Sequence, residues 1–121
     1  MKLIDAVARL ERAGESNAKM WQKLHVAIDE FATFLAGVLP GGQATELPRG
    51  YSFQSWPSGD YQIRRCNDLK FDLTRTCKHP DAMIYFCEDI HNGWVTELIG
   101  FLERRSQMLM KAAASLTPNA K

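Results

Sequence analysis

The chain has 121 residues, of which 45% are hydrophobic and 24% are charged, and its formal net charge is +1. This length fits one domain that buries a core without disulfide or metal support, and the composition argues against a disordered chain. The small net charge gives no strong field for nucleic acid or anionic membranes, and no apolar run approaches the roughly 20 residues of a membrane span. A signal-peptide pattern is absent and the three cysteines suggest reduced thiols, so we expect a cytoplasmic protein.

The first element is a long amphipathic helix predicted over residues 2–39. Its stripe advances by alternating steps of four and three residues and consists of Leu3, Val7, Leu10, Gly14, Asn17, Trp21, Leu24, Ile28, Phe31, Leu35 and Val38. That spacing keeps side chains on one face, and an unbroken helix would be about 54 Å long. Gly14 and Ser16 leave two alternatives open, a joint or one continuous helix, and the unbroken phase of the stripe favours continuity.

Residues 51–75 change to a period of two, which predicts an antiparallel β-meander. The expected strands are 51–56, 60–66 and 69–74, separated by turns at 57–60 and 67–68. Segment 80–93 stays ambiguous. Residues 82–87 fit a buried fourth strand, but Pro80 and Asp81 equally fit the first turn of a helix, and Asn92-Gly93 is a hairpin signal.

A second helix is predicted over 94–116, because Val95, Leu98, Leu102 and Leu109 again advance by three and four. The fold class is therefore α+β: one domain, residues 1–121, with long terminal helices flanking a small meander over 51–75 that could extend to 87. A monomer could pair the two helices as an antiparallel helical hairpin over one face of the meander. Three strands cover little of a stripe of about 50 Å, so we expect a homodimer, with a monomer bent at Gly14 and Gly100 as the alternative.

Cysteines and histidines gather between residues 66 and 91 and suggest one metal site. The four candidate ligands of a structural zinc ion are Cys77, His79, Cys87 and His91. The Cys87–His91 spacing suits a metal only if this segment is helical. No C-x2-C pair is present and a buried cysteine is commonly a small apolar residue, so we expect no cofactor, with zinc as an alternative.

Basic residues on or beside the meander form a candidate nucleic-acid-binding face. They are Arg64, Arg65, Lys70 and Arg75. Neighbouring aromatic residues could stack on bases, but Tyr61 and Phe71 have core-facing parity and nearby aspartates dilute the charge. A zinc-stabilised nucleic-acid-binding module is therefore the second hypothesis, behind a solvated outer face.

The sequence contains no nucleophile elbow, P-loop or dinucleotide-binding motif, so we expect a protein without enzymatic activity. Cys–His chemistry is the third hypothesis. The leading hypothesis is a protein-binding role, as an inhibitor, immunity-type protein, adaptor or chaperone. Its candidate contact residues are Trp56, with Tyr51 and Phe53 on the same strand, and Arg105 on the stripe of the last helix.

Overall fold

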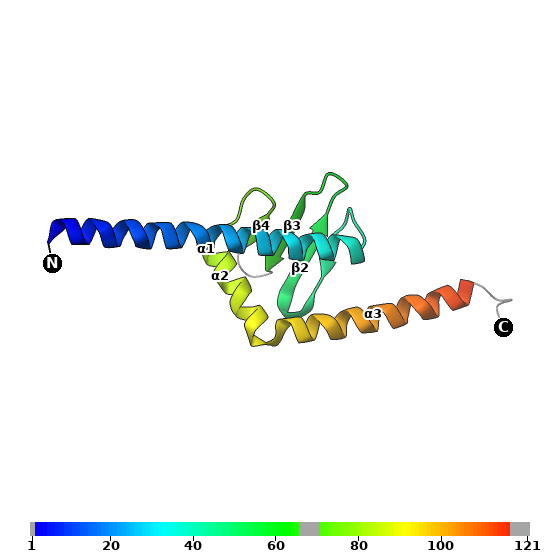
Figure 1. Ribbon diagram of the computed structural model, residues 1–121. Helices are drawn as coiled ribbons and strands as arrows, with labels where there is room; N and C mark the ends of the chain where they lie inside the picture. Colours follow the sequence, from blue (N-terminus) through cyan, green and yellow to red (C-terminus); the bar gives the residue numbers. More distant parts are fainter. Residues whose placement is uncertain (1, 66–70, 117–121) are drawn as a thin grey trace.

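The computed structural model describes residues 2–65 and 71–116 and confirms the α+β class, with helical segments at both ends of an antiparallel sheet (Figure 1). The elements in chain order are α1 (Leu3–Val38), β1 (Thr45–Glu46), η1 (Pro48–Gly50), β2 (Tyr51–Ser55), β3 (Tyr61–Arg65), β4 (Asp72–Thr74), α2 (Pro80–Asp89), η2 (Ile90–Trp94) and α3 (Val95–Leu116).

The sheet has the strand order β1-β2-β3-β4, with every neighbouring pair antiparallel. Phe53 pairs with Ile63, which pairs with Leu73, and this row is buried. Since side chains alternate between the two faces of a strand, the other face carries the polar residues. The three-strand meander is confirmed. The fourth strand is the short β1, not residues 82–87, and the predicted turn at 67–68 lies outside the described residues.

Segment 80–93 is helical. Pro80 occupies the first turn of α2, where its missing N–H costs nothing, and the ring Nδ1 of His79 accepts a hydrogen bond from the Asp81 N–H at 3.3 Å. Asn92 and Gly93 then leave helical geometry, with Gly93 at φ 95°. The Asn-Gly pair therefore makes a bend between α2 and α3 instead of a hairpin.

The core is a single aromatic cluster between the buried sheet face and the helices. Tyr51 of β2 lies 4.9 Å from Trp94 and 5.7 Å from Phe86, measured between ring centroids, and Phe31 of α1 contacts both of the latter residues. The Trp94 indole N–H donates to the Pro48 carbonyl at 2.9 Å, which satisfies the one polar group of a fully buried ring. This cluster joins α1, the sheet and the bend at residues 90–94.

Helix α1 is continuous across Gly14, as the phase of its stripe predicted. Its first buried residue is Ile28, and α3 has its only buried residue at Leu98. The free ends of the two helices point away from opposite sides of the body, and both helices run in the same general direction (Figure 1). The antiparallel helical hairpin expected from the sequence is therefore wrong.

Replacing Gly93 with alanine should lower the free energy of unfolding by about 1–2 kcal/mol, because a Cβ is disfavoured at positive φ. Urea denaturation followed by circular dichroism measures this change. Gly37 is the matched control: it lies within α1 with open space around an added Cβ. Gly37→Ala should raise stability by about 0.5–1 kcal/mol, and equal effects of the two substitutions would contradict the role assigned to the bend.

Candidate protein-binding surfaces

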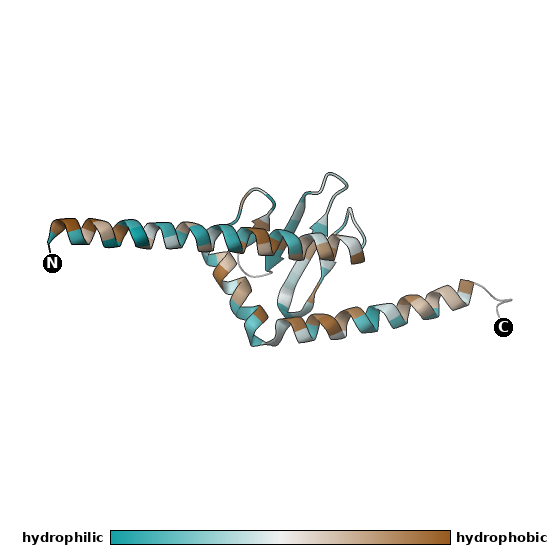
Figure 2. Cartoon of the chain, in the orientation of Figure 1, coloured by the Kyte–Doolittle hydropathy of each residue, from teal (hydrophilic) through white to brown (hydrophobic). Residues whose placement is uncertain are grey.

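The N-terminal part of α1 projects beyond the body as a solvent-exposed arm, which we define as residues 3–24 and name the α1 arm. Leu3 is 81% exposed and Leu10 is 72% exposed, although both belong to the apolar stripe. The large exposed apolar side chains of the arm are Leu3, Ile4, Val7, Leu10, Met20 and Trp21. Figure 2 shows hydrophobic residues along this free end. A row of this length on one helix is more than the scattered apolar exposure usual for a monomer.

Charges on the α1 arm lie away from the stripe. Counted as a heptad, the stripe occupies positions a and d, and all charged residues of the arm except Glu11 fall at the outer positions b, c and f. Half of the positions beside the stripe are alanine, namely Ala6, Ala13 and Ala18, and the other half are Ile4, Glu11 and Met20. The alanines let another helix approach closely at those positions.

The C-terminal part of α3 forms a second exposed arm, residues 103–116, which we name the α3 arm. Its exposed apolar residues are Met108, Leu109, Met110 and Leu116. Arg105 is half-buried at the base of this arm, and Arg104 and Lys111 add positive charge against the single acid Glu103. The α3 arm is thus apolar and basic, whereas the α1 arm has nearly balanced charge.

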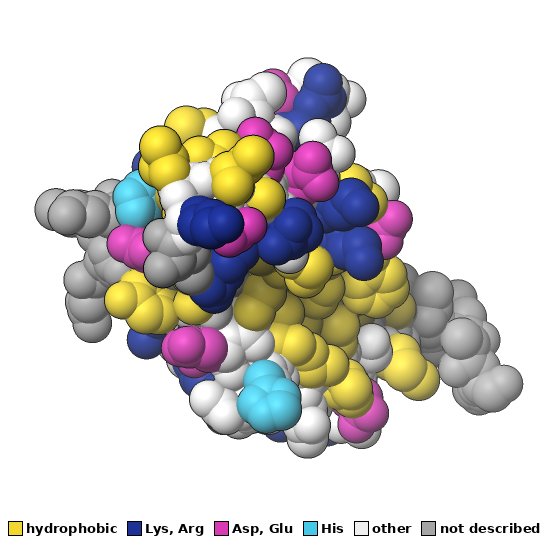
Figure 3. All heavy atoms as spheres, turned by 60° about the vertical axis from the view of Figure 1, so that its left-hand side comes forward, with side chains coloured by type: hydrophobic (Ala, Val, Ile, Leu, Met, Phe, Trp, Pro, Cys, Tyr) yellow, Lys and Arg dark blue, Asp and Glu magenta, His cyan; other side chains and the backbone are white. Residues whose placement is uncertain are grey.

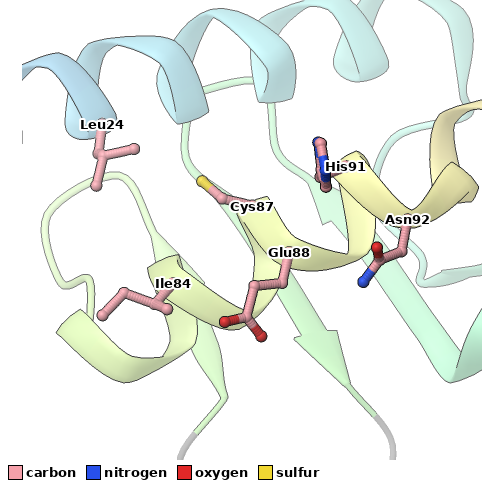
Figure 4. A pocket seen from close by; sticks show the side chains of 6 residues that line it. All are labelled: Leu24, Ile84, Cys87, Glu88, His91 and Asn92. Atoms are coloured by element: carbon pink, nitrogen blue, oxygen red, sulfur yellow. The ribbon is translucent and has the colours of Figure 1, made fainter.

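A groove separates the base of the α1 arm from α2. It has a volume of about 330 Å³ and is lined by Leu24, Ile84, Cys87, Glu88, His91 and Asn92. Leu24 points from α1 toward α2, and the Cys87 sulfur points back toward α1 (Figure 4). Burial raises the pKa of the Cys87 thiol, so it stays protonated and apolar near neutral pH. Figure 3 shows a band of hydrophobic side chains across one face of the molecule, with Lys and Arg along one side of it.

The predicted hairpin residues separate into two groups. Trp56 is 39% exposed at the tip of the β2–β3 hairpin, beside a hollow of about 290 Å³ that Tyr61 and Arg75 also line. Tyr51 and Phe53 are each only 1% exposed and belong to the core. Their placement corrects the sequence assignment, because residues of that strand with core-facing parity pack on the helices and present no surface to a partner.

The candidate basic face is partly neutralised by acids. Arg64 lies 3.9 Å from Asp72, and Arg65 lies 3.7 Å from Asp89. Arg75 is exposed at the end of β4, and Lys70 lies outside the described residues. This arrangement gives the nucleic-acid hypothesis little support, since the two strand arginines already have carboxylate partners.

The candidate zinc ligands do not assemble into one site. Cys77 is exposed in the loop before α2, His79 caps α2, and Cys87 and His91 line the groove. Within residues 2–65 and 71–116, no group of three or more His, Cys, Asp or Glu side chains is placed to hold a metal ion. The zinc-dependent hypothesis therefore lacks its ligand cluster among these residues.

An ionic cluster that the sequence analysis missed attaches α1 to the sheet. The Lys78 ammonium is fully buried, 2.9 Å from Asp29 Oδ1, and also donates to the Arg75 carbonyl at 3.0 Å. The Tyr61 hydroxyl donates to the same Asp29 oxygen. Burial alone would raise the pKa of Asp29, but the hydrogen bonds from Tyr61 and Lys78 and the nearby positive charges hold it below its usual value.

Two further polar contacts fix the helical segment 80–116. The Tyr51 hydroxyl donates to Asp89 Oδ2 at 2.5 Å, and burial together with this bond raises the pKa of Tyr51. Arg49, at φ 60°, pairs with Glu97 and donates to the Asn92 carbonyl at 3.0 Å. These contacts hold the bend and therefore set the direction in which the α3 arm leaves the body.

Comparison with protein-family models, curated proteins and solved structures finds no match to this chain. None of the helices within the described ranges combines the length and apolar character that crossing a membrane requires. The functional assignment therefore rests on the surfaces themselves.

Removing either partner of the Asp29–Lys78 pair should destabilise the protein unequally. Asp29→Asn leaves a fully buried ammonium without its counter-ion and should cost about 2–3 kcal/mol. Lys78→Met should cost less, because the Asp29 side chain is 42% exposed and can be hydrated. Chemical denaturation at pH 7 compares the two variants, and a larger loss for Lys78→Met would refute this assignment.

The pH dependence provides the control for this pair. Because the folded pKa of Asp29 is lowered, its stabilisation is present above the unfolded carboxyl pKa of about 3.9 and is lost as pH falls through the folded value. The Asn variant should therefore lose less stability than the wild type between neutral and strongly acidic pH. Parallel loss in both proteins would show that other carboxylates dominate.

Proposed function

We propose that this chain is a non-enzymatic protein-binding module that acts as a homodimer, in an inhibitor, immunity-type, adaptor or chaperone role. The observation that carries the proposal is the pair of helical arms, each with apolar side chains in water. In an isolated subunit these apolar side chains stay exposed to water, so forming the helical arms gains no free energy from burying them. A partner surface would supply it, at roughly 1.5–3 kcal/mol for each large apolar side chain that becomes fully buried.

The α1 arm supports self-association. Its stripe is the direct continuation of the one that α1 buries against the sheet, and all its charged residues except Glu11 lie at the outer positions of the helix. A surface of this kind matches a second helix with the same pattern, as in coiled coils and helical bundles.

The α3 arm and Trp56 support binding to another protein. Methionines at residues 108 and 110 are flexible and polarisable, and methionine is frequent on surfaces that accept varied partners. Arg104, Arg105 and Lys111 would favour an acidic partner, and an exposed tryptophan at a hairpin tip is a common interface anchor.

Leu10→Glu should convert the dimer to a monomer. A symmetric dimer buries two copies of this residue, so the lost burial is about 3–6 kcal/mol, or at least about 100-fold in the dimer dissociation constant. Sedimentation equilibrium across a concentration series measures this constant. Gln22→Glu is the matched control, because it makes the same charge change on the outer side of the arm; it should leave the constant unchanged.

The homodimer proposal fails if the wild-type chain sediments as a monomer at every concentration. It also fails if Gln22→Glu dissociates the protein as much as Leu10→Glu does, because the effect would then be one of charge and not of the stripe.

Partner binding should depend on the α3 arm and on Trp56 separately from the dimer. Leu109→Lys and Trp56→Ser change side chains that are 60% and 39% exposed and that lie outside the buried core. A binding protein retained by the immobilised wild type should be lost with either substitution and kept with Gln22→Glu. Retention by all variants would place its contact elsewhere.

A further inference from the structure

We propose that two copies pair through antiparallel α1 arms, and that Leu3 of each copy enters the groove between α1 and α2 of the other. This inference rests on the homodimer proposed above and specifies its orientation, its register and the occupant of the groove. It commits to a second copy of this chain as the occupant.

The register follows from the stripe. In an antiparallel helix pair, a positions of one helix face d positions of the other. The register that covers the whole α1 arm sets Leu3 at the level of Ile28 of the partner, Val7 beside Leu24, Leu10 beside Trp21 and Gly14 beside Asn17. Ile28 is 2% exposed within its own subunit, so Leu3 would enter the groove at this level instead of packing on Ile28, and a longer overlap would run into the body. A shorter overlap by one heptad would leave Leu24 uncovered.

Electrostatics do not oppose this register. Glu11 is the only charged residue beside the stripe, and the register sets it near Ala18 of the partner. The remaining flanking contacts join Ile4 with His25, Ala6 with Ala27 and Ala13 with Met20. No like charges therefore meet at the positions where ion pairs normally control pairing.

The amount of surface is sufficient for a stable pair. An apolar side chain worth 1.5–3 kcal/mol at 25 cal/mol per Å² buries roughly 60–120 Å², so six such side chains supply roughly 360–720 Å² when they are fully exposed. Val7 and Trp21 supply less, because they are 44% and 38% exposed. The alanines between the six side chains of the arm add more. A standard interface buries about 800 Å² on each partner, so two complete arms supply approximately this area.

The groove lies where the register ends. Leu24 lines it from α1, and Ile84 and Cys87 line it from α2. The first turn of the partner's α1, with Leu3 and Ile4, arrives at this level of the arm. The groove has a volume of about 330 Å³, which is larger than a leucine side chain needs. It can therefore accept the first turn of the partner's α1 without rearrangement of the core.

Unsatisfied polar groups of the two copies lie at the same axial level in this register. The ring nitrogen Nε2 of His25 is buried with no hydrogen-bond partner among the described residues. The N-terminus of α1 has no side-chain cap from Lys2, and the first N–H groups of a helix have no acceptor within it. In the proposed register the free N–H groups of one copy lie at the level of the free ring nitrogen of the other.

The α3 arm of the partner is a weaker occupant. It is 14 residues long against 22 in the α1 arm, so it would leave much of the stripe uncovered. Charge does not favour it either. The α3 arm is basic, with Arg104, Arg105 and Lys111 opposed only by Glu103, and the nearly balanced α1 arm offers it no net attraction.

The test is a disulfide between residue 3 and Cys87. The 121-residue chain carrying Cys66→Ser and Cys77→Ser retains Cys87 as its one thiol, and Leu3→Cys adds the second. Before oxidation, sedimentation equilibrium gives the oligomeric state and circular dichroism checks the fold. Mild oxidation followed by non-reducing electrophoresis and peptide mass spectrometry then identifies the linked residues. Asp5→Cys, on the outer side of the same turn, is the matched control.

We expect a dimer in which most chains are linked through residue 3 and Cys87, with the link lost when Cys87→Ser is added and absent for Asp5→Cys. A link that survives Cys87→Ser joins residue 3 to itself and means a parallel pair, which overturns the register. A dimer without any link also overturns it and leaves the homodimer standing. A monomer before oxidation overturns both proposals.

A second variant tests the antiparallel arrangement without changing the first turn of α1, where Leu3→Cys could itself disturb the structure. Leu10→Cys alone, with Cys66, Cys77 and Cys87 replaced by serine, places its two thiols about 16 Å apart along the axis in the antiparallel register. It should not form a covalent dimer. Efficient linking of Leu10→Cys chains would contradict the antiparallel arrangement whatever the behaviour of residue 3.

Discussion

Helix α1 is much longer than the sheet on which it packs, and this difference in length constrains the whole molecule. Helix α1 has 36 residues and is about 54 Å long, while the longest strands have five residues and span about 17 Å. A sheet of that size can cover only the last third of the helix, from Ile28 to its end at Val38. The rest of the stripe must be either exposed or covered by another chain. The same constraint applies to α3, whose packing ends near Arg105.

Polar contacts decide where each arm leaves the body. Asp29 follows the base of the α1 arm directly and receives Tyr61 and Lys78 from the sheet and the loop after it. Arg49 performs the corresponding task for α3 through Glu97 and the Asn92 carbonyl. An apolar face alone would permit α1 to slide along its axis by one turn, since the stripe repeats. The buried Lys78 ammonium allows only one position of α1 along its axis, because any other position would separate it from the Asp29 carboxylate and leave a buried charge unpaired.

Strong periodic signals predicted most of the fold. The stripe gave the span and continuity of α1, and the alternation around Phe53, Ile63 and Leu73 gave the meander and its buried face. Local signals left segment 80–93 ambiguous because they point to different structures: Pro80 indicates a helix start and Asn92-Gly93 indicates a turn. In the structure both signals hold, since Pro80 begins α2 and Asn92-Gly93 forms the bend between α2 and α3. Strand β1 has two residues, too few to show a period.

The candidate surfaces were less predictable than the elements. Parity separates Trp56 from Tyr51 and Phe53, and it should have removed the latter two from the list of contact residues. The Asp29–Lys78 pair joins residues 49 positions apart, and no local pattern reports it. Whether a stripe is buried depends on how much sheet lies under it, which the stripe itself does not reveal.

The two arms differ in chemistry, and the difference separates their roles within the proposed function. The α1 arm combines branched aliphatic residues with alanines and keeps its charges outside, which suits close and specific packing against one fixed partner. The α3 arm combines methionines with arginine and lysine, which suits a surface that adapts to its partner's shape. Because the arms leave from opposite sides of the body (Figure 1), a pair formed through α1 leaves both α3 arms accessible. Self-association and partner binding would then be compatible in one assembly, with two equivalent partner sites related by the symmetry of the dimer.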